Sequence, residues 1–256
     1  MIFKFKESKI FYTIQGSGNA VVLLHGFLEN ASMWDFFLPT LIKNHLVITI
    51  DLLGHGKTDS LGYVHTMELM AEMVQEIISK EKINKATFIG HSMGGYVALA
   101  FAEKYPERMN ALVLLNSTSE ADSTEKKENR DRAIQLVKQN KKGFLSMAIS
   151  NLFAEQNRLI YKKEIHQLKK EALEFPIQGI VATLEGMKIR KDRTSILKNL
   201  LIPKYIITGI QDPIMPFLQQ KKLTKKCGCS FIELSGGHMS TIENKEEMLN
   251  FVHFIE

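Results

Sequence analysis

The chain has 256 residues, of which 45% are hydrophobic and 24% are charged. These values are typical of a globular protein built as one large domain, or as one domain with a sizeable insertion. No apolar run approaches the ~20 residues of a membrane span, so the composition excludes a membrane-spanning helix. Residues 1–6 alternate apolar and charged side chains, which predicts a strand and not a signal peptide. We therefore expect a cytoplasmic protein.

The net charge of +5 is concentrated in one part of the chain. Residues 119–195 carry 16 Lys or Arg and 11 Asp or Glu, so this segment holds the whole positive excess. The signs alternate along it, as in Glu125-Lys126-Lys127-Glu128, which is typical of solvated helix faces. A nucleic-acid surface needs basic clusters with aromatic residues on one face, so we expect no nucleic-acid partner.

Up to residue 116 the sequence alternates apolar runs of strand length with helix-like stretches. The predicted strands are residues 9–14, 20–24, 46–50, 86–89 and 111–115. Several of these runs are apolar on both faces, which is typical of central parallel strands covered by helices. Between them, residues 66–80 carry apolar side chains at helical spacing. This alternation predicts an α/β fold with a mostly parallel central sheet flanked by helices.

The alternation stops after residue 118 and resumes near residue 203. The intervening segment has helical patterns and no apolar run typical of a buried strand: 133–138, 143–153, 159–175 and 177–187. Two further strands are predicted at 203–209 and 230–234. We therefore expect a core domain formed by residues 1–118 and 196–256, interrupted by a helical insertion at residues 119–195.

One pentapeptide, Gly90-His91-Ser92-Met93-Gly94, lies between the predicted strand 86–89 and a predicted helix at 96–104. A serine between small residues at a strand-to-helix junction is the sequence form of a nucleophile elbow. The tight turn requires small flanking residues, which Gly90, Gly94 and Gly95 supply, and glycine also tolerates unusual backbone angles. We predict Ser92 as a nucleophile at a helix N-terminus, where developing negative charge is favoured.

A serine nucleophile needs a base, and the base needs a carboxylate that orients it. His238 follows a predicted strand in the glycine-rich loop Gly236-Gly237-His238, and we predict it as the base. Asp212 also follows a strand, and we predict it as the carboxylate, because the competing position carries Asn116. The chain order Ser92, Asp212, His238 is the order expected for this type of elbow.

The other seven histidines are predicted to have structural roles or to be exposed, and not to act in catalysis. His25, His55 and His91 adjoin glycine or the nucleophile and are expected to shape loops. The remaining four lack a supporting context and are interpreted as structural or exposed: His45, His65, His166 and His253. For the oxyanion hole we predict two backbone N–H donors, that of Met93 directly after the nucleophile and that of Phe27 in the loop after residues 20–24.

Together these motifs resemble the α/β-hydrolase superfamily, in its serine-nucleophile, carboxylesterase or enol-lactonase-like branch. The residues that carry the resemblance are His25-Gly26-Phe27, Asp51 to Thr58, Gly90 to Gly95, Gly209 to Asp212 and Gly236 to His238. The resemblance implies a helical cap inserted after the sixth strand. It also implies the same roles: nucleophile for Ser92, acid for Asp212, base for His238 and oxyanion donors for Phe27 and Met93.

Serine at position 92 separates this chain from the haloalkane dehalogenases and epoxide hydrolases of the superfamily, which use aspartate there. The hypothesis favoured is a serine hydrolase that cleaves a small to medium, moderately apolar carboxylic ester through an acyl-enzyme on Ser92. The alternatives on the same triad are an acyltransferase, a carbon–carbon bond hydrolase and a thioesterase. Another is a ligand-binding signalling protein on a hydrolase scaffold. The stretch from Met187 to Asp192 is similar to an M-x-x-R-x-D pattern of esterase and lactonase-like members.

The predicted insertion carries apolar side chains that either line a substrate site or pack against the core. The candidate substrate-binding residues are Phe144, Met147, Phe153 and Phe175. They favour an uncharged, moderately apolar acyl group on a small-molecule ester. We expect no cofactor and no metal, because the chemistry needs neither. Cys227 and Cys229 are interpreted as reduced thiols, since a disulfide across one intervening residue would close a very small loop. The sequence makes no prediction of oligomeric state.

Overall fold

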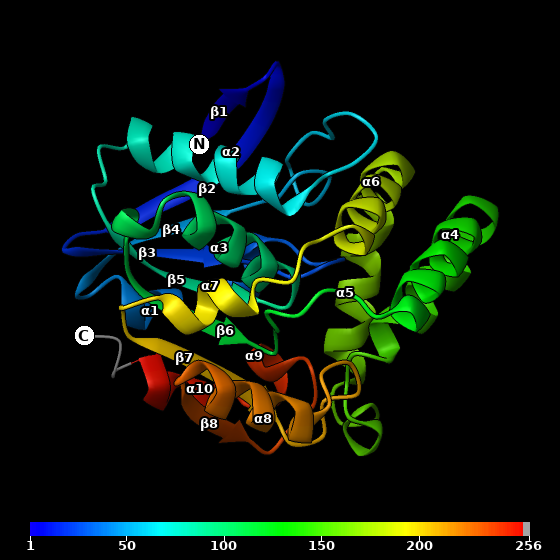
Figure 1. Ribbon diagram of the computed structural model, residues 1–256. Helices are drawn as coiled ribbons and strands as arrows, with labels where there is room; N and C mark the ends of the chain where they lie inside the picture. The colour runs from blue at the N-terminus through cyan, green and yellow to red at the C-terminus, as the bar shows by residue number, and fades with distance from the viewer. Residues whose placement is uncertain (253–256) are drawn as a thin grey trace.

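The computed structural model describes residues 1–252. Its centre is an eight-stranded sheet with the spatial order β1-β2-β4-β3-β5-β6-β7-β8, in which β1 and β2 pair antiparallel and the other six strands are parallel to one another (Figure 1). The strands are β1 (Ile2–Phe5), β2 (Ser8–Gly16), β3 (Asn19–Leu24), β4 (His45–Ile50), β5 (Ala86–His91), β6 (Met109–Leu115), β7 (Lys204–Gly209) and β8 (Ser230–Leu234). The predicted α/β fold with a mostly parallel sheet is confirmed.

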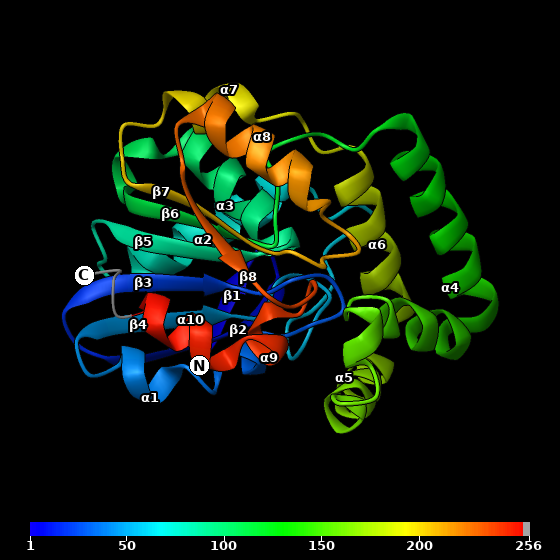
Figure 2. The same cartoon turned by 90° about the horizontal axis from the view of Figure 1, so that it is seen from below.

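Helices cover both faces of the sheet (Figure 2). One face is covered by α2 (Met67–Lys80), α3 (Met93–Lys104), α7 (Thr194–Asn199) and α8 (Phe217–Cys227), and the other by α1 (Leu38–Leu41), α9 (Ser240–Glu243) and α10 (Lys245–Val252). Successive side chains of a strand point to opposite faces. In β3, accordingly, Val22 and Leu24 belong to the core on the first face, whereas Val21 and Leu23 belong to the core on the second. This double burial explains the continuous apolar runs in the sequence.

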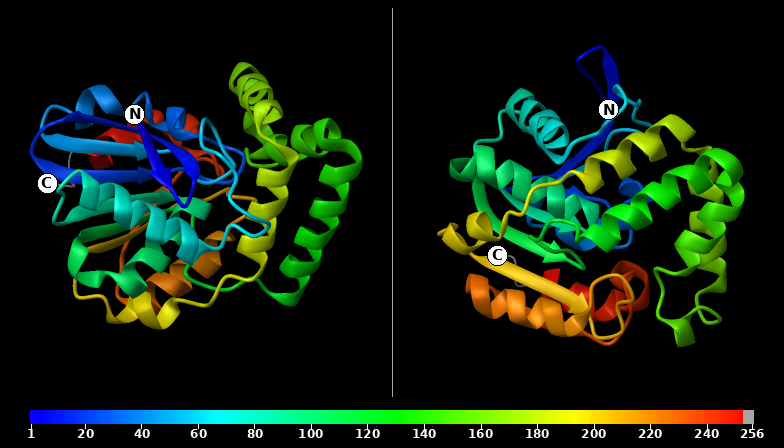
Figure 3. Two further views of the ribbon diagram at one scale, coloured as in Figure 1. Left: turned by 90° about the horizontal axis from the view of Figure 1, so that it is seen from above. Right: turned by 45° about the vertical axis from the view of Figure 1, so that its right-hand side comes forward.

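Between β6 and β7 the chain leaves the sheet and forms α4 (Thr124–Ser150), α5 (Lys162–Glu174) and α6 (Ile177–Lys188). We call residues 124–188 the insertion. These helices stand beyond the carboxyl ends of the parallel strands (Figures 2 and 3). Helix α4 is interrupted at Asn140, whose backbone is non-helical, and the Asn140 side chain accepts a hydrogen bond from the Gly143 N–H at 2.9 Å. That break separates the two patterns at 133–138 and 143–153.

The segment that follows the insertion is held to the core by buried ion pairs. Arg193 is 2% exposed and pairs with Glu68 of α2 and Glu103 of α3 at 2.6 and 2.8 Å. The following helix α7 contacts α3 and α8, so it packs as part of the core although it begins at Thr194, inside the predicted insertion. The predicted boundary therefore cuts through α7. An amphipathic pattern in the sequence predicts a helix but does not tell which surface that helix will cover.

No helix within residues 1–252 combines the length and the apolar character that crossing a bilayer demands. Cys227 is buried and Cys229 is half-buried, and both are free thiols. Burial raises the pKa of both thiols, that of Cys229 to about 11, so they stay protonated. His253 lies outside the described residues.

Candidate active site

Ser92 lies in a strained turn between β5 and α3. Its backbone has φ 48° and ψ −111°, a conformation that non-glycine residues rarely adopt. The turn is held on both sides: the Ser92 N–H donates to the Leu115 carbonyl at 2.9 Å, and the Ser117 hydroxyl donates to the Ser92 carbonyl at 2.7 Å. Such local strain persists where the surrounding structure over-determines it, and it is typical of functional sites.

The glycines around Ser92 are needed for space. A Cβ at Gly90 would lie 2.4 Å from the Gly94 carbonyl carbon, and one at Gly94 would lie 2.3 Å from the Leu24 carbonyl oxygen. None of Gly90, Gly94 and Gly95 has a positive φ, so the unusual backbone angle expected of these glycines is instead borne by Ser92 itself. The elbow therefore depends on close approach of β5, α3 and β3.

Asp212 and His238 come together behind this turn. Asp212 follows β7 and His238 follows β8, and the His238 Nδ1 lies 3.0 and 2.8 Å from the two carboxylate oxygens of Asp212. Asp212 is 7% exposed and His238 is 1% exposed, so solvent hardly reaches the two side chains. The carboxylate therefore orients the ring with Nδ1–H toward Asp212, which leaves Nε2 for a second partner.

Asp212 is kept ionised by a dense set of donors. The backbone N–H groups of Ile214 and Met215 donate to Oδ1 at 2.8 and 2.9 Å, and the Asn116 side-chain amide donates to Oδ2 at 2.8 Å. Burial opposes ionisation, but His238 and these hydrogen bonds outweigh it and hold the pKa of Asp212 below its usual value. Asn116 thus supports the ionised carboxylate of Asp212. From the sequence, Asn116 is excluded as the acid because its side chain is an amide and not a carboxylate.

Ser92 and His238 line one cavity of about 410 Å³ between the core and the insertion. Phe27 and Leu28 of the loop after β3 line it from the core, and α4 and α6 contribute most of the opposite wall. Most of the lining is apolar, as is usual for a small-molecule site. The cavity lies at the carboxyl ends of the parallel strands, where open α/β sheets bind their ligands.

The two predicted oxyanion donors lie at this end of the sheet as well. Met93 is the first residue of α3, and Phe27 precedes Leu28, whose φ of 66° is strained for a branched side chain. In residues 1–252, no protein acceptor takes the backbone N–H of Phe27 or Met93. Two donors without a protein partner, close to the predicted nucleophile Ser92, have the character that oxyanion stabilisation requires.

A buried ion pair, which the sequence did not reveal, lies beneath the site. His91 and Glu29 are 0% and 3% exposed, and His91 Nδ1 lies 2.9 Å from Glu29 Oε2. His91 Nε2 lies 2.9 Å from the His238 carbonyl oxygen. Because both ring nitrogens face acceptors, both carry a proton, and His91 is an imidazolium. Burial alone would lower the pKa of His91, but Glu29 and the carbonyl raise it above its usual value.

The same pair holds the loop that carries Phe27. Glu29 Oε2 also accepts the Gly26 N–H at 2.6 Å, and its pKa is lowered because His91 and this hydrogen bond outweigh the cost of burial. The pair therefore joins the loop after β3, the residue before Ser92 and the backbone of His238. The signal in the sequence was an acid three residues after Gly26 and a histidine next to the nucleophile.

Three other buried histidines, His25, His55 and His65, shape loops in neutral form, and burial lowers the pKa of each. His25 accepts the Leu52 N–H at Nε2 and faces the Gly26 carbonyl at Nδ1, which requires a single proton on the ring. His55 has its pKa lowered to about 3 and His65 to about 4. His65 accepts the Leu61 N–H and contacts the Thr183 hydroxyl at 3.1 Å, so it joins a core loop to α6.

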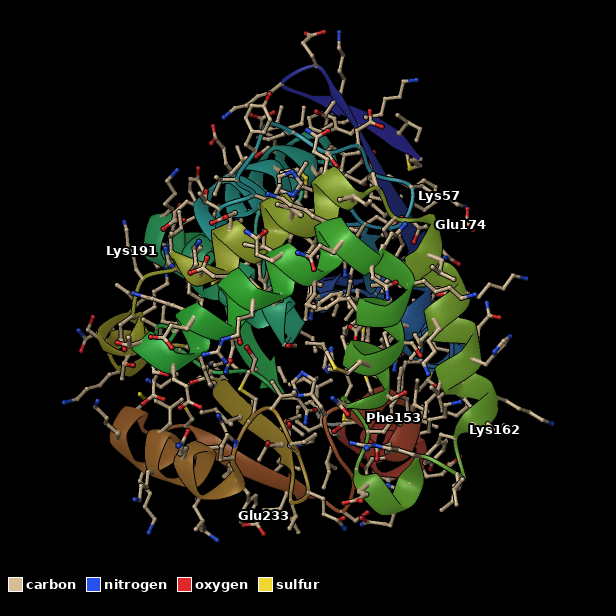
Figure 4. The ribbon with its side chains drawn as sticks, turned by 90° about the vertical axis from the view of Figure 1, so that its right-hand side faces the viewer. Lys57, Phe153, Lys162, Glu174, Lys191 and Glu233 are labelled. Carbon is tan, nitrogen blue, oxygen red and sulfur yellow. The ribbon has the colours of Figure 1, made fainter. Side chains whose placement is uncertain are left out.

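Of the four side chains predicted to bind substrate, Phe144 lines the cavity. The structure places the other three elsewhere. Met147 is 51% exposed. Phe153, which is labelled in Figure 4, packs against Ile165 and Met239. Phe175 lies against the ring of His55. The physical reason is that these positions lie on different elements: Phe144 and Met147 lie three residues apart on α4, Phe153 lies beyond the end of α4, and Phe175 directly follows α5.

The insertion is also bonded to the loop that carries His238. The His238 N–H donates to the Leu152 carbonyl at 3.0 Å, and the Glu243 carboxylate accepts the Ala154 N–H and the Asn157 side-chain amide at 3.2 and 2.7 Å. A Cβ at Gly237 would lie 2.4 Å from the Ala154 nitrogen, and the backbone of Gly237 does not have a positive φ. Gly237 therefore permits close approach of the insertion, whereas a Cβ at Gly236 would meet Asn244 and Glu243.

The comparisons with known proteins place these features in context. A family model described as alpha/beta hydrolase fold matches residues 19–169. A putative 2-succinyl-6-hydroxy-2,4-cyclohexadiene-1-carboxylate synthase of Bacillus subtilis is 30% identical over 243 residues, which cover 89% of this chain and 86% of that protein. An uncharacterized protein of Mycobacterium tuberculosis is 34% identical over 106 residues, which cover 41% of this chain but only 31% of that longer protein.

Solved structures are similar over nearly the whole chain. A thermophilic esterase from Thermogutta terrifontis has a TM-score of 0.91 and 30% identity, and the alignment covers 96% of this chain and 92% of that one. An enol-lactonase from Burkholderia xenovorans has a TM-score of 0.91 at 21% identity, with 99% and 98% of the two chains covered. The second likeness bears on the fold alone.

Proposed function

The chain belongs to the α/β-hydrolase family, and we propose that within this family it is a serine hydrolase that cleaves a small to medium, moderately apolar carboxylic ester. The observation that carries the proposal is the buried Asp212–His238 pair, with bonds of 2.8 and 3.0 Å, in the wall of the cavity that Ser92 also lines. The esterase from Thermogutta terrifontis, at 30% identity, supports the same reaction class.

In the proposed reaction the Ser92 oxygen attacks the ester carbonyl while His238 Nε2 takes the hydroxyl proton. Asp212 holds the ring and stabilises the imidazolium. The N–H groups of Phe27 and Met93 donate to the oxyanion, a contribution of about 3 kcal/mol for each donor. His238 then returns its proton to the departing alkoxide, which leaves as the alcohol. Water, activated by the same histidine, releases the acid from the acyl-enzyme and restores Ser92.

We further propose that the insertion serves as a cap over this reaction. It supplies the cavity wall opposite Phe27 and is bonded to the His238 loop through the Leu152 carbonyl. A closed apolar cavity excludes bulk water, which strengthens electrostatic interactions with the oxyanion. The domain division into residues 1–118 and 196–256 around residues 119–195 belongs to this proposal, with α7 assigned to the core by its packing.

A fluorophosphonate probe and a panel of nitrophenyl esters of increasing chain length test the proposal. We expect the probe to label Ser92, and Ser92→Ala to abolish labelling and lower kcat by at least about a thousandfold. Ser79→Ala is the matched control, because Ser79 is an exposed serine on α2. Failure of the probe to label folded protein, together with ester turnover that survives Ser92→Ala, contradicts the proposal.

The name of one relative supports keeping other reactions of the same three residues as alternatives to ester hydrolysis. The relative from Bacillus subtilis, which aligns over most of both chains, is named a putative carboxylate synthase and not an esterase. The alternatives on the same triad are therefore kept beside ester hydrolysis: carbon–carbon bond hydrolysis, thioester cleavage and acyl transfer. Product analysis separates these reactions, since ester hydrolysis yields one acid and one alcohol, whereas an added alcohol acceptor reveals transfer. A melting-temperature shift by ligand in a protein without turnover would favour a binding role instead.

A further inference from the structure

One wall of the Ser92 cavity is charged, although most of its lining is apolar. Three charged side chains at the start of the insertion and just before it line the cavity: Asp122, Lys126 and Arg130. We call these three, with Arg190 behind them, the basic wall. Arg130 and Arg190 both pair with the single carboxylate of Asp122, at 2.6 Å in the case of Arg190. Two guanidinium groups on one carboxylate leave one positive charge uncompensated.

Arg190 is the buried member of this positively charged group. It is 4% exposed, its guanidinium lies 4.1 Å from the ring centre of Tyr96, and its Nε is buried without a hydrogen-bond partner in residues 1–252. Tyr96 itself lines the cavity. Because Arg190 is buried and permanently charged, it fixes Asp122 in the ionised form and cannot be screened well by solvent.

Lys126 adds a second uncompensated charge. It is half-buried at the cavity, and within residues 1–252 no carboxylate lies within ion-pair distance of its amine. Burial lowers the pKa of Lys126, with Arg190 and Arg130 acting in the same direction and Asp122 and Glu120 against it. Lys126 also borders a second hollow that Glu120 and Glu125 line, so this residue lies between the cavity and the outer surface.

The other carboxylate of the cavity does not neutralise this wall. Glu29 lines the cavity but is already paired with the imidazolium of His91 at 2.9 Å. The formal charge of the basic wall is therefore +2, opposite an apolar surface that includes Phe144, Leu184 and Met187. A half-buried cation without a partner is unfavourable in such surroundings unless an anion joins it.

We propose that the substrate of this cavity carries a carboxylate, which binds at Lys126 and Arg130 while an apolar spacer places the scissile carbonyl at Ser92. The proposal rests on the proposed ester hydrolysis and specifies its substrate class. It departs from the expectation of an uncharged acyl group, since the alternating charges of residues 125–128 did not show that Lys126 turns toward the cavity. Arg130 already donates from Nε and Nη2 to Asp122, which leaves its Nη1 for a substrate carboxylate, and Lys126 supplies a point charge.

Matched ester pairs test the proposal. On the acyl side, 4-nitrophenyl butyrate is compared with the half-esters of succinate and glutarate. On the alcohol side, 4-nitrophenyl butyrate is compared with the butyrate of a carboxylated nitrophenol. We expect kcat/KM to favour the anionic member of at least one pair by about 10- to 100-fold, as for hydrogen bonds to a charged group. The pair that shows the preference tells which half of the substrate bears the carboxylate.

Variants then assign the preference to the basic wall. In Lys126→Gln we expect the anionic-to-neutral ratio of kcat/KM to fall by about tenfold, and in Lys126→Glu by about a hundredfold, because repulsion replaces attraction. Lys127→Gln is the control, since Lys127 is exposed on the same helix and does not line the cavity. A preference that is absent, or that survives Lys126→Glu unchanged, overturns the proposal.

A binding measurement separates this proposal from the proposed function. Calorimetry on Ser92→Ala compares the mono-anilide of glutarate with neutral butyranilide, amides that mimic the two kinds of ester. Tighter binding of the anionic amide, lost in Ser92→Ala with Lys126→Glu, supports the basic wall even if no ester is hydrolysed. Equal binding of the two amides by a protein that hydrolyses neutral esters through Ser92 overturns the basic wall alone.

Discussion

The two halves of the candidate site are built in different ways. The core half is held by buried hydrogen bonds and strained backbone at strand ends: Leu28, Ser92 and Asn116 all have positive φ beyond β3, β5 and β6. The insertion half is held by side-chain packing and by a few links, such as His65 to Thr183 and His238 to Leu152. Backbone hydrogen bonds hold catalytic groups in a narrowly defined geometry, whereas a surface of packed side chains can adjust to different substrates. We therefore expect changes in the core half to alter turnover and changes in the insertion half to alter substrate affinity.

The largest expected effect comes from Asp212→Asn in the core half. An amide in place of the carboxylate favours the wrong tautomer of His238, and we expect kcat to fall by about four orders of magnitude. Asn116→Ala, which removes one donor to Asp212, should cost far less. Asp131→Asn, an exposed aspartate of α4, is the control for charge. Steady-state kinetics on the best ester measures the effect, and an unchanged kcat in Asp212→Asn would remove Asp212 from the mechanism.

The next largest effect concerns the Glu29–His91 pair. His91→Gln leaves Glu29 charged and buried, which costs about 3–5 kcal/mol of the free energy of unfolding. Because the folded pKa of His91 is raised, its contribution is fully present below the unfolded value of about 6.5 and is lost as pH rises through the folded pKa. Denaturant titrations of the wild type and His91→Gln should therefore converge as pH rises above about 6.5.

Two further measurements sharpen the role of that pair. The exposed His166 provides the control, since His166→Gln should leave the free energy of unfolding unchanged. We also expect His91→Gln to lower kcat more than it raises KM, because the pair holds the loop of Phe27 and the backbone of His238. A variant of full stability at every pH would show that the pair contributes nothing to the fold.

Phe144→Ala tests the insertion half. Phe144 lines the cavity, and removing its ring exposes apolar substrate surface, so we expect KM to rise by about tenfold with a smaller change in kcat. Met147→Ala, an exposed position on the same helix, should change neither constant. If Phe144→Ala lowers kcat by more than it raises KM, the insertion takes part in the chemistry and the contrast between the two halves fails.

His65, at the junction of the two halves, affects stability only at acidic pH. Its folded pKa of about 4 lies below the unfolded value of about 6.5, so the unfolded chain binds more protons between these values. Stability should therefore decrease as pH falls from about 6.5 to about 4, by up to about 1.4 kcal/mol per pH unit from this residue. His65→Gln should flatten this slope, and an identical slope in both proteins would refute the assignment.

The sequence by itself determined the fold class and the placement of Ser92, Asp212 and His238 at strand ends. These features are local, because apolar runs, turn glycines and short motifs act on neighbouring residues. Only the tertiary structure revealed the Glu29–His91 pair, the support of Asp212 by Asn116, and the distance of Phe153 and Phe175 from the cavity. It also turned Lys126, a residue of an ordinary charged helix pattern, toward the cavity. Such contacts join segments far apart in the chain, so packing decides them and no local pattern encodes them.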